Sequence, residues 1–145
     1  MDSKYDALKL ENQLCFPLYA CSRKVMKLYH PYLSELNLTY TQYICMMVLW
    51  EMRKISAKEL GNRLFLDSGT LTPVLKSLEK KGLLRRYRSN EDERVLLVEI
   101  TPEGEALKER AVDVPYLLGD SLDMDREEAY QLYRLLCEFL GREAK

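Results

Sequence analysis

Residues 67–84 read DSGTLTPVLKSLEKKGLL, and this stretch decides the fold because its pattern changes at Gly82. The spacing predicts a helix over about 68–81 that ends there, since glycine commonly follows the last turn of a helix. Beyond it, residues 83–89 and 94–100 are strand-like runs separated by the turn sequence NEDE. The stretch and its continuation therefore predict a helix followed by a β-hairpin.

Two further predicted helices precede this stretch, and each begins with a capping sequence. Thr39 and Gln42 cap a helix over 40–50, whose apolar residues lie on nearly every face and predict deep burial. A second cap at Ser56 opens a short helix over 57–65. Helix, short helix, turn, helix and hairpin in this order are typical of the winged helix-turn-helix, whose second short helix enters the DNA major groove. We predict a mainly α fold with a small β-hairpin wing.

Helices are also predicted on both sides of this module. Apolar residues three and four apart over 8–28 indicate a helix that Pro17 would kink unless the helix starts late. Pro31 should end it, because the residue before a proline avoids the helical region. Downstream, Pro102 fits the first position of another helix, and a last helix is predicted to begin near Asp125.

The predicted last helix carries more apolar surface than a helix at a chain end normally leaves in water. The residues are Leu132, Leu135, Leu136, Phe139 and Leu140. Such a face predicts a partner subunit. Because the first helix also has an apolar stripe, we expect a homodimer formed through the terminal helices.

Composition limits the class of protein. The 145 residues, 47% of them hydrophobic and 31% charged, fit a single globular domain over 1–145. No signal peptide or membrane-spanning stretch is recognisable, so we expect a cytoplasmic protein with reduced cysteines and no membrane partner. The four cysteines and the single histidine lack the paired spacing of a zinc site, and we predict no metal or other cofactor.

Charge is distributed unevenly along a chain whose formal net charge is −1. Residues 68–88 hold six basic side chains against the single acid Glu79, and such a local basic patch is typical of a DNA footprint. The predicted DNA-contacting residues in this segment are Ser68, Thr70, Thr72, Lys76, Arg86 and Arg88. Alternatively, the hydroxyl residues cap the helix and the basic residues form a solvated face.

Three stretches together resemble the MarR family of transcriptional regulators: DSGTLTPVLKSLEKKGLL, the DER of the hairpin turn, and LLVEITPEG. The resemblance covers nearly the whole chain. It implies a dimer with a helical dimerisation region, here about 1–38 and 102–145, and a winged helix-turn-helix over about 39–101. It also implies a pseudo-palindromic operator in double-stranded DNA as the partner.

Asp92 and Arg94 match the wing motif of that family. The resemblance implies that Arg94 reaches into the minor groove while Asp92 orients the wing. The alternative is that Arg94 forms a surface salt bridge with Glu91 or Glu93.

The N-terminal part resembles one branch of the family, the organic-hydroperoxide sensors of the OhrR type. The matching stretches are LENQLCFPLYACSRKV, KLYHPYL and LTYTQY. In these sensors a hydroperoxide oxidises a cysteine near the start of the first helix, and tyrosines from neighbouring elements bond its sulfur. The matching residues are Cys15, Tyr29 and Tyr40. Tyr19, four residues after the cysteine, would share its helix face and could be a further wall or donor.

Thiol chemistry is consistent with this role. Only a thiolate attacks a peroxide oxygen, and a thiol with the ordinary pKa of about 8.5 is mostly protonated at neutral pH. Phenolic donors that stabilise the anion therefore raise reactivity, and they bring no charge into an apolar pocket. The competing interpretation is that Cys15 is a small buried residue and that the tyrosines belong to the core or to an interface.

Several thiols could react with an oxidised Cys15. Cys21 lies about 9 Å further along the same helix and on another face, too far for a disulfide. Cys45 lies in the most apolar helix and is expected to be inert. Cys137 near the end of the last helix could approach Cys15 of a partner subunit, but we favour capping by a small cellular thiol.

Three functions are compatible with the sequence. The leading hypothesis is a repressor that binds its operator when Cys15 is reduced and leaves it when an organic hydroperoxide oxidises Cys15. The second is a MarR-type regulator that a noncovalent aromatic ligand releases from DNA. The third is a thiol peroxidase, an enzyme that uses the same cysteine, but the basic helix and the DER wing favour a regulator that is not an enzyme.

Overall fold

A computed structural model describes residues 3–141, which form two compact units that divide between Val114 and Pro115. The helices are α1 (Cys15–Glu35), α2 (Tyr40–Met52), α3 (Ala57–Leu64), α4 (Ser68–Lys80), α5 (Pro102–Ala111), α6 (Val114–Ser121) and α7 (Arg126–Phe139). The 3-10 turns η1 (Asp6–Leu8) and η2 (Leu10–Asn12) precede α1. The strands are β1 (Lys54–Ser56), β2 (Leu84–Arg88) and β3 (Leu96–Ile100). Residues 1–2 and 142–145 of the predicted dimerisation segments lie outside the described residues.

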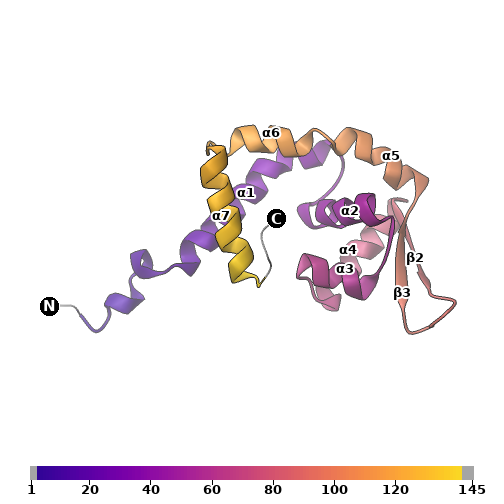
Figure 1. The fold of residues 1–145 in the computed structure, drawn as a ribbon, viewed down its shortest axis with the longest axis horizontal. Coiled ribbons are helices and arrows are strands. Elements are labelled where there is room, and N and C mark those ends of the chain that lie inside the picture. Colours follow the sequence, from indigo (N-terminus) through magenta and orange to yellow (C-terminus); the bar gives the residue numbers. More distant parts are fainter. Residues whose placement is uncertain (1–2, 142–145) are drawn as a thin grey trace. The chain divides into compact units, whose positions relative to one another are not determined.

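Helices α2, α3 and α4 and the hairpin of β2 and β3 form the predicted winged module (Figure 1). Strand β1 is an addition that the sequence analysis does not predict, because three residues are too few to show an alternating pattern. It pairs antiparallel with β3, so the sheet order is β1-β3-β2. In the middle strand, Val98 pairs with Ile55 on one side and with Arg86 on the other.

The core of the first unit lies where α2, α3 and α4 meet the sheet. The deep burial predicted for α2 is confirmed, since Cys45, Met46 and Leu49 expose none of their surface. The neighbouring elements contribute Leu60, Leu71, Leu75, Leu78, Leu84 and Val98. Each such side chain stabilises the fold by about 1.5–3 kcal/mol when buried, so the winged module carries a core of its own.

Side-chain caps fix where the helices begin. Thr39 forms the predicted capping box at α2: its hydroxyl accepts from the Gln42 N–H, and the Gln42 side chain accepts from the Thr39 N–H. Ser56 caps α3 by accepting from the Glu59 N–H at 3.1 Å. These caps satisfy backbone donors that a helix start otherwise leaves without a partner.

Helix α5 is seated on the winged module through its first turn. A Cβ atom added at Gly104 would lie 2.1 Å from the Leu83 carbonyl oxygen, so only glycine allows this close approach. The Gly104 carbonyl accepts a hydrogen bond of 2.9 Å from the Trp50 indole N–H of α2. The indole also meets the Tyr43 ring edge-on at 6.3 Å between centroids. Strand β3 therefore leads directly into a helix that is fixed to α2.

Helix α1 differs from its prediction at both ends. It begins late, at Cys15, and Pro17 therefore lies in its first turn, where a missing N–H costs nothing. The prediction that Pro31 ends the helix is wrong, because α1 continues past it. A proline inside a helix costs about 3 kcal/mol. Leu33 and Leu36 beyond it are buried, at about 1.5–3 kcal/mol each, and their burial offsets that cost.

The second unit contains most of α6, which the sequence analysis does not predict, and α7. Helix α7 begins as predicted, with a capping box between Asp125 and Glu128. Its apolar residues stand largely exposed, namely Leu132, Leu135, Leu136, Phe139 and Leu140. None of the helices within residues 3–141 is long and apolar enough to cross a membrane.

Candidate nucleic-acid interface and cysteine site

An aspartate just before α4 forms its cap. The Asp67 carboxylate accepts from the Thr70 N–H at 2.8 Å, and its hydrogen bonds to Thr70 hold the pKa of Asp67 below its usual range. The Thr72 hydroxyl donates to the Ser68 carbonyl at 2.7 Å. Asp67 therefore caps α4. The alternative interpretation, in which the hydroxyl residues Ser68, Thr70 and Thr72 cap this helix, is wrong in this respect.

Helix α4 has one core face and one exposed polar face. Leu71, Leu75 and Leu78 point into the core. The exposed positions carry the predicted contact residues Ser68, Thr70, Thr72 and Lys76. Pro73 also lies on the exposed side, in the second turn of α4. Small hydroxyls and an ammonium group on a free helix face are groups that bond phosphates and base edges.

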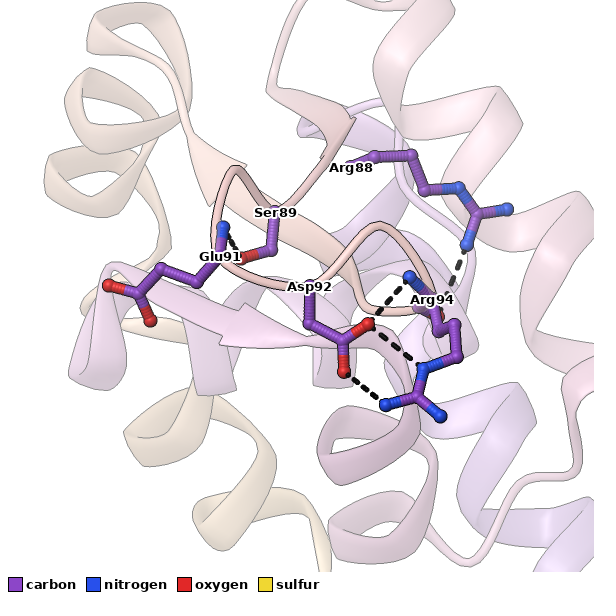
Figure 2. Close-up of polar contacts among 5 residues, drawn as sticks. All are labelled: Arg88, Ser89, Glu91, Asp92 and Arg94. Carbon is purple, nitrogen blue, oxygen red and sulfur yellow. Dashed lines mark hydrogen bonds and ion pairs between the residues drawn. The ribbon is translucent and has the colours of Figure 1, made fainter.

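The wing turn holds Arg94 in a two-pronged pair with Asp92 (Figure 2). Arg94 Nε and Nη2 donate to the two carboxylate oxygens at 3.0 and 3.1 Å, and the Arg94 N–H donates at 3.0 Å. These bonds lower the pKa of Asp92 and raise the pKa of Arg94. The Arg94 side chain is still 90% exposed. The predicted alternative partners, Glu91 and Glu93, are not the ones it uses.

Two further contacts brace the same turn (Figure 2). The Ser89 hydroxyl accepts from the Glu91 N–H at 3.2 Å, and Arg88 Nη1 donates to the Arg94 carbonyl at 3.4 Å. Arg88 is exposed, so the end of the hairpin carries two accessible guanidinium groups, those of Arg88 and Arg94.

Arg86 differs from the other basic candidates because its side chain is paired with a carboxylate of the protein itself. Its backbone N–H donates to Glu79 at 2.8 Å, and its guanidinium donates to the same carboxylate at 3.1 and 3.4 Å. The guanidinium holds the pKa of Glu79 below its usual range. With its side chain only 19% exposed, Arg86 fixes β2 to α4, and a direct contact with DNA stays a prediction.

Asp67 and Glu79 also belong to this arrangement, although neither is predicted from the sequence. Asp67 has a recognisable signal, because an aspartate three residues before Thr70 is a common helix cap. Glu79 has no local signal. Its pairing with Arg86 arises only when the chain turns at Gly82 and brings β2 beside α4.

Cys15 is the first residue of α1, and within one chain it is exposed. Its interpretation as a small buried residue is therefore wrong for the single chain. Tyr19, one turn further along, is also exposed, and the Arg23 guanidinium lies 5.7 Å from the centroid of its ring. The described part of one chain does not enclose this thiol.

Tyr29 and Tyr40 lie together, but not with Cys15. Their ring centroids are 4.9 Å apart, and Tyr43 packs against both. Burial raises the pKa of Tyr29 to about 12 and also raises that of Tyr40, so both remain phenols that can donate a hydrogen bond at neutral pH. Tyr29 follows Cys15 by fourteen residues on the same helix, which is about 21 Å along its axis.

The other cysteines differ in accessibility. Cys45 has no exposed surface, and burial raises its pKa to about 12, as expected for an inert thiol. Cys137 on α7 is also buried, whereas Cys21 is exposed. Within residues 3–141, no group of three potential metal ligands lies close enough together to hold a metal ion.

Comparisons with known proteins point to one class. The family model of the transcriptional regulators SarA/Rot matches residues 27–111. An organic hydroperoxide resistance transcriptional regulator of Bacillus subtilis (strain 168) is 49% identical over 135 residues, which cover 93% of this chain and 90% of the relative.

Two solved structures extend the similarity to the fold. Reduced AbfR of Staphylococcus epidermidis bound to DNA superposes with a TM-score of 0.77 at 33% identity, covering 95% of this chain and 96% of that one. An overoxidised form of AbfR has also been solved on DNA. A mutant MarR from Escherichia coli complexed with operator DNA gives a TM-score of 0.81 at 26% identity, covering 96% and 99%.

These similarities confirm two predictions from the sequence. The first is the winged, mainly helical fold, and the second is the resemblance to MarR-type regulators and, within them, to a regulator of organic hydroperoxide resistance. The matched family and the Bacillus subtilis relative are transcriptional regulators, and the AbfR and MarR structures are complexes with DNA.

Proposed function

Because the chain belongs to the SarA/Rot family of transcriptional regulators, we propose that it binds an operator in double-stranded DNA and leaves it when an organic hydroperoxide oxidises Cys15. One observation carries the proposal. The winged module presents the polar face of α4 and the exposed Asp92–Arg94 pair within a single folded chain. The protein acts as a repressor whose reduced form is the DNA-binding form.

The DNA contacts divide between α4 and the wing. Ser68, Thr70, Thr72 and Lys76 face the major groove and its phosphates. Arg94 enters the minor groove or contacts its phosphates. A guanidinium has five N–H donors, and the pair with Asp92 occupies two of its side-chain donors, so the others remain for DNA. Asp92 thus sets the direction in which Arg94 points.

A second copy of the chain completes the regulator. The exposed apolar residues of α7 are more than a chain-end helix normally leaves in water, and we assign them to a homodimer interface. In such a dimer, two copies of α4 read the two halves of a pseudo-palindromic operator. They then lie about 34 Å apart, one turn of DNA.

The sensing step is a single oxidation of Cys15. Its thiolate sulfur attacks the terminal oxygen of the hydroperoxide, the O–O bond breaks, and the alkoxide leaves and takes a proton from water. The products are a cysteine sulfenic acid and an alcohol. A small thiol then condenses with the sulfenic acid, giving a mixed disulfide and water. Burial of Cys137 favours this small-thiol route over a disulfide with Cys137.

The tyrosines act on the thiol of the other subunit. Cys15 and Tyr29 of one chain are about 21 Å apart along α1, so Tyr29 cannot reach the sulfur of its own chain. Dimerisation through the terminal helices brings Cys15 of one copy to Tyr29 and Tyr40 of the other. Both phenols are protonated at neutral pH and stabilise the thiolate by donating to it.

The test is a DNA-shift assay with purified protein across a series of cumene hydroperoxide concentrations, with mass spectrometry of the cysteines on the same samples. We expect loss of operator binding in step with one oxidation at Cys15, and recovery on addition of a reductant. Oxidation that begins at Cys21 or Cys137, or release without any mass change, contradicts the proposal.

The same assay separates the other two functions. A regulator released by a noncovalent aromatic ligand leaves DNA when the ligand is added, responds in the presence of reductant, and shows no mass change. A thiol peroxidase consumes many equivalents of hydroperoxide per chain when a thiol is supplied. The proposed sensor consumes one equivalent per oxidation of Cys15.

A further inference from the structure

A buried glutamine connects the start of α2 to the end of α4. Gln42 is a polar residue within the core and exposes only 6% of its surface. Its amide nitrogen donates to the Ser77 hydroxyl of α4 at 2.9 Å. Its amide oxygen accepts from the Thr39 N–H at 3.0 Å and from Lys81 Nζ at 2.9 Å. Gln42 is thus held by both ends of its side chain.

Lys81 extends this connection to α1. Besides Gln42, its ammonium group donates to the carbonyl of Asn37 at 2.5 Å. Asn37 follows the end of α1 and has a φ of 54°, which reverses the chain between α1 and α2. The carbonyl of Glu35, the last residue of α1, accepts from Arg110 of α5 at 2.6 Å. Arg110 therefore holds the carbonyl end of α1, where the helix dipole favours positive charge, and Lys81 holds the turn that follows α1.

The sensing tyrosines lie at the same corner. Tyr40 stands between Thr39 and Gln42 in the sequence, and its ring packs on Tyr29 of α1 at 4.9 Å. A displacement of α1 relative to α2 therefore acts on the tyrosine pair and on the bonds of Gln42 and Lys81 together.

We propose that Gln42, Ser77 and Lys81, which we call the corner clasp, are positioning residues that carry a displacement of α1 to the recognition helix α4. This inference rests on the proposed function, since it assumes that oxidation of Cys15 displaces α1. It assigns a role to residues that touch neither the thiol nor DNA.

Hydrogen bonds suit this task because they are directional. Gln42, at the centre of the clasp, is buried, and a bond left unmade at a buried polar group is costly, so the clasp favours discrete arrangements over gradual deformation. Apolar contacts between α2 and α4 alone can slide by small steps. With the clasp formed, α4 keeps one orientation relative to the end of α1, and the spacing of the two recognition helices in a dimer is fixed with it.

The experiment compares the operator Kd of oxidised and reduced protein. For the wild type we expect oxidation to raise the Kd by about thirtyfold to a hundredfold, the effect of losing a fit worth about 2–3 kcal/mol. Lys81→Met keeps most of the length of the side chain and removes its donors. We expect this variant to bind DNA when reduced and its oxidised-to-reduced ratio to fall at least about threefold. Lys81→Arg, which keeps a cationic donor, should restore most of the ratio.

Lys80→Met is the matched control. Lys80 is the adjacent lysine at the end of α4 and is exposed, so its replacement removes the same positive charge from this surface. Its ratio should equal that of the wild type. A merely structural clasp lowers the affinities of both states equally, and an unchanged ratio in Lys81→Met overturns the inference. If Lys81→Met does not fold, the same ratio measured in Ser77→Ala decides.

Failure of the proposed function gives a different result. If oxidation does not change the operator affinity of the wild type, the sensing proposal fails, and the clasp loses its regulatory role with it. If the wild type is released, Cys15→Ser is not, and Lys81→Met has the wild-type ratio, then sensing stands and the clasp inference alone is wrong.

Discussion

The DNA-facing half and the sensing half of this protein are completed in different ways. The winged module has its own core, and its contact residues lie within one continuous segment, 68–94, of one chain. The residues proposed for sensing also lie on one chain, but Cys15 and Tyr29 are about 21 Å apart on a single helix. One chain brings together the proposed DNA-contacting residues, but it does not bring Cys15 to Tyr29.

This difference explains how a signal at a thiol can control binding elsewhere. If the sensing site needs two copies, then its chemistry acts on the interface between them. The spacing of the two winged modules depends on that interface. A site enclosed within one chain could change its own module but would have no direct effect on the distance between two of them.

The largest expected effect comes from preventing dimerisation. Leu136→Asp places a charge on the apolar face of α7 and should give a monomer in sedimentation at micromolar concentration. Operator affinity should fall by at least about a hundredfold, since two linked modules gain that much over one. The replacement Leu136→Met preserves the apolar face and should stay dimeric. A dimer in Leu136→Asp would show that α7 does not form the interface.

The next effect concerns the thiol. Cys15→Ser keeps the size of the side chain but cannot form a sulfenic acid, so it should bind the operator and stay bound under organic hydroperoxide. Hydroperoxide should raise the operator Kd of the wild type by about thirtyfold to a hundredfold. It should change the operator Kd of Cys15→Ser by no more than about twofold. Cys21→Ser, which alters the other exposed thiol of α1, should respond like the wild type. Release of Cys15→Ser protein by hydroperoxide would exclude Cys15 as the sensor.

Arg94 tests whether the DNA site is complete in one chain. Arg94→Ala should weaken operator binding by about 1–3 kcal/mol, or roughly fivefold to over a hundredfold, without changing fold or dimerisation. Arg94→Lys keeps the charge but loses the two-pronged pair with Asp92, so its loss should be intermediate. Binding measured across a salt series separates lost phosphate contacts, which reduce the salt dependence, from a lost orientation. Equal affinity of Arg94→Ala and wild type would remove the wing from the interface.

The tyrosines should give a smaller, kinetic effect. Tyr29→Phe and Tyr40→Phe each remove one phenolic donor to the thiolate and should slow oxidation of Cys15 without abolishing it. Stopped-flow oxidation followed by mass spectrometry measures the rate. Tyr43→Phe, in the same aromatic cluster, is the control and should react at the wild-type rate. If all three variants match the wild type, the tyrosines belong to the core only.

The smallest effect concerns the pair that fixes the wing to α4. The pKa of Glu79 is lowered in the folded state, so this carboxylate stabilises the fold above its ordinary pKa of about 4.3, and the contribution is lost as the pH falls through the lowered value. Glu79→Gln should therefore melt at a lower temperature than the wild type at pH 7, and the two melting temperatures should converge as the pH falls through the lowered pKa of Glu79. A constant difference at every pH would exclude the ionised pair as the cause.

The sequence predicts local features of this fold well. The α2 capping box, the hairpin and the exposed face of α7 each depend on residues within a few positions of one another. The errors come from tertiary effects. Pro31 does not end α1 because Leu33 and Leu36 are buried beyond it, and β1 forms only because β3 offers an unpaired edge to Ile55.

The same distinction holds for the candidate sites. Asp92 and Arg94 are two positions apart, so the motif and the contact coincide. The role of Arg86 depends on Glu79 across the turn at Gly82, and periodicity cannot reveal it. The proposed proximity of Cys15 to Tyr29 and Tyr40 depends on a second chain, which no pattern within one sequence describes.

Trp50 has a practical consequence for studying this protein. It is the single tryptophan of the chain, and its indole N–H bonds to α5 while its ring meets Tyr43. The natural protein therefore carries its one tryptophan fluorophore, which can be excited selectively at long wavelength, at the junction where the wing leads into α5. Its emission reports on that junction without a label, so the docking of α5 can be followed in real time while the thiol at the far end of α1 is oxidised.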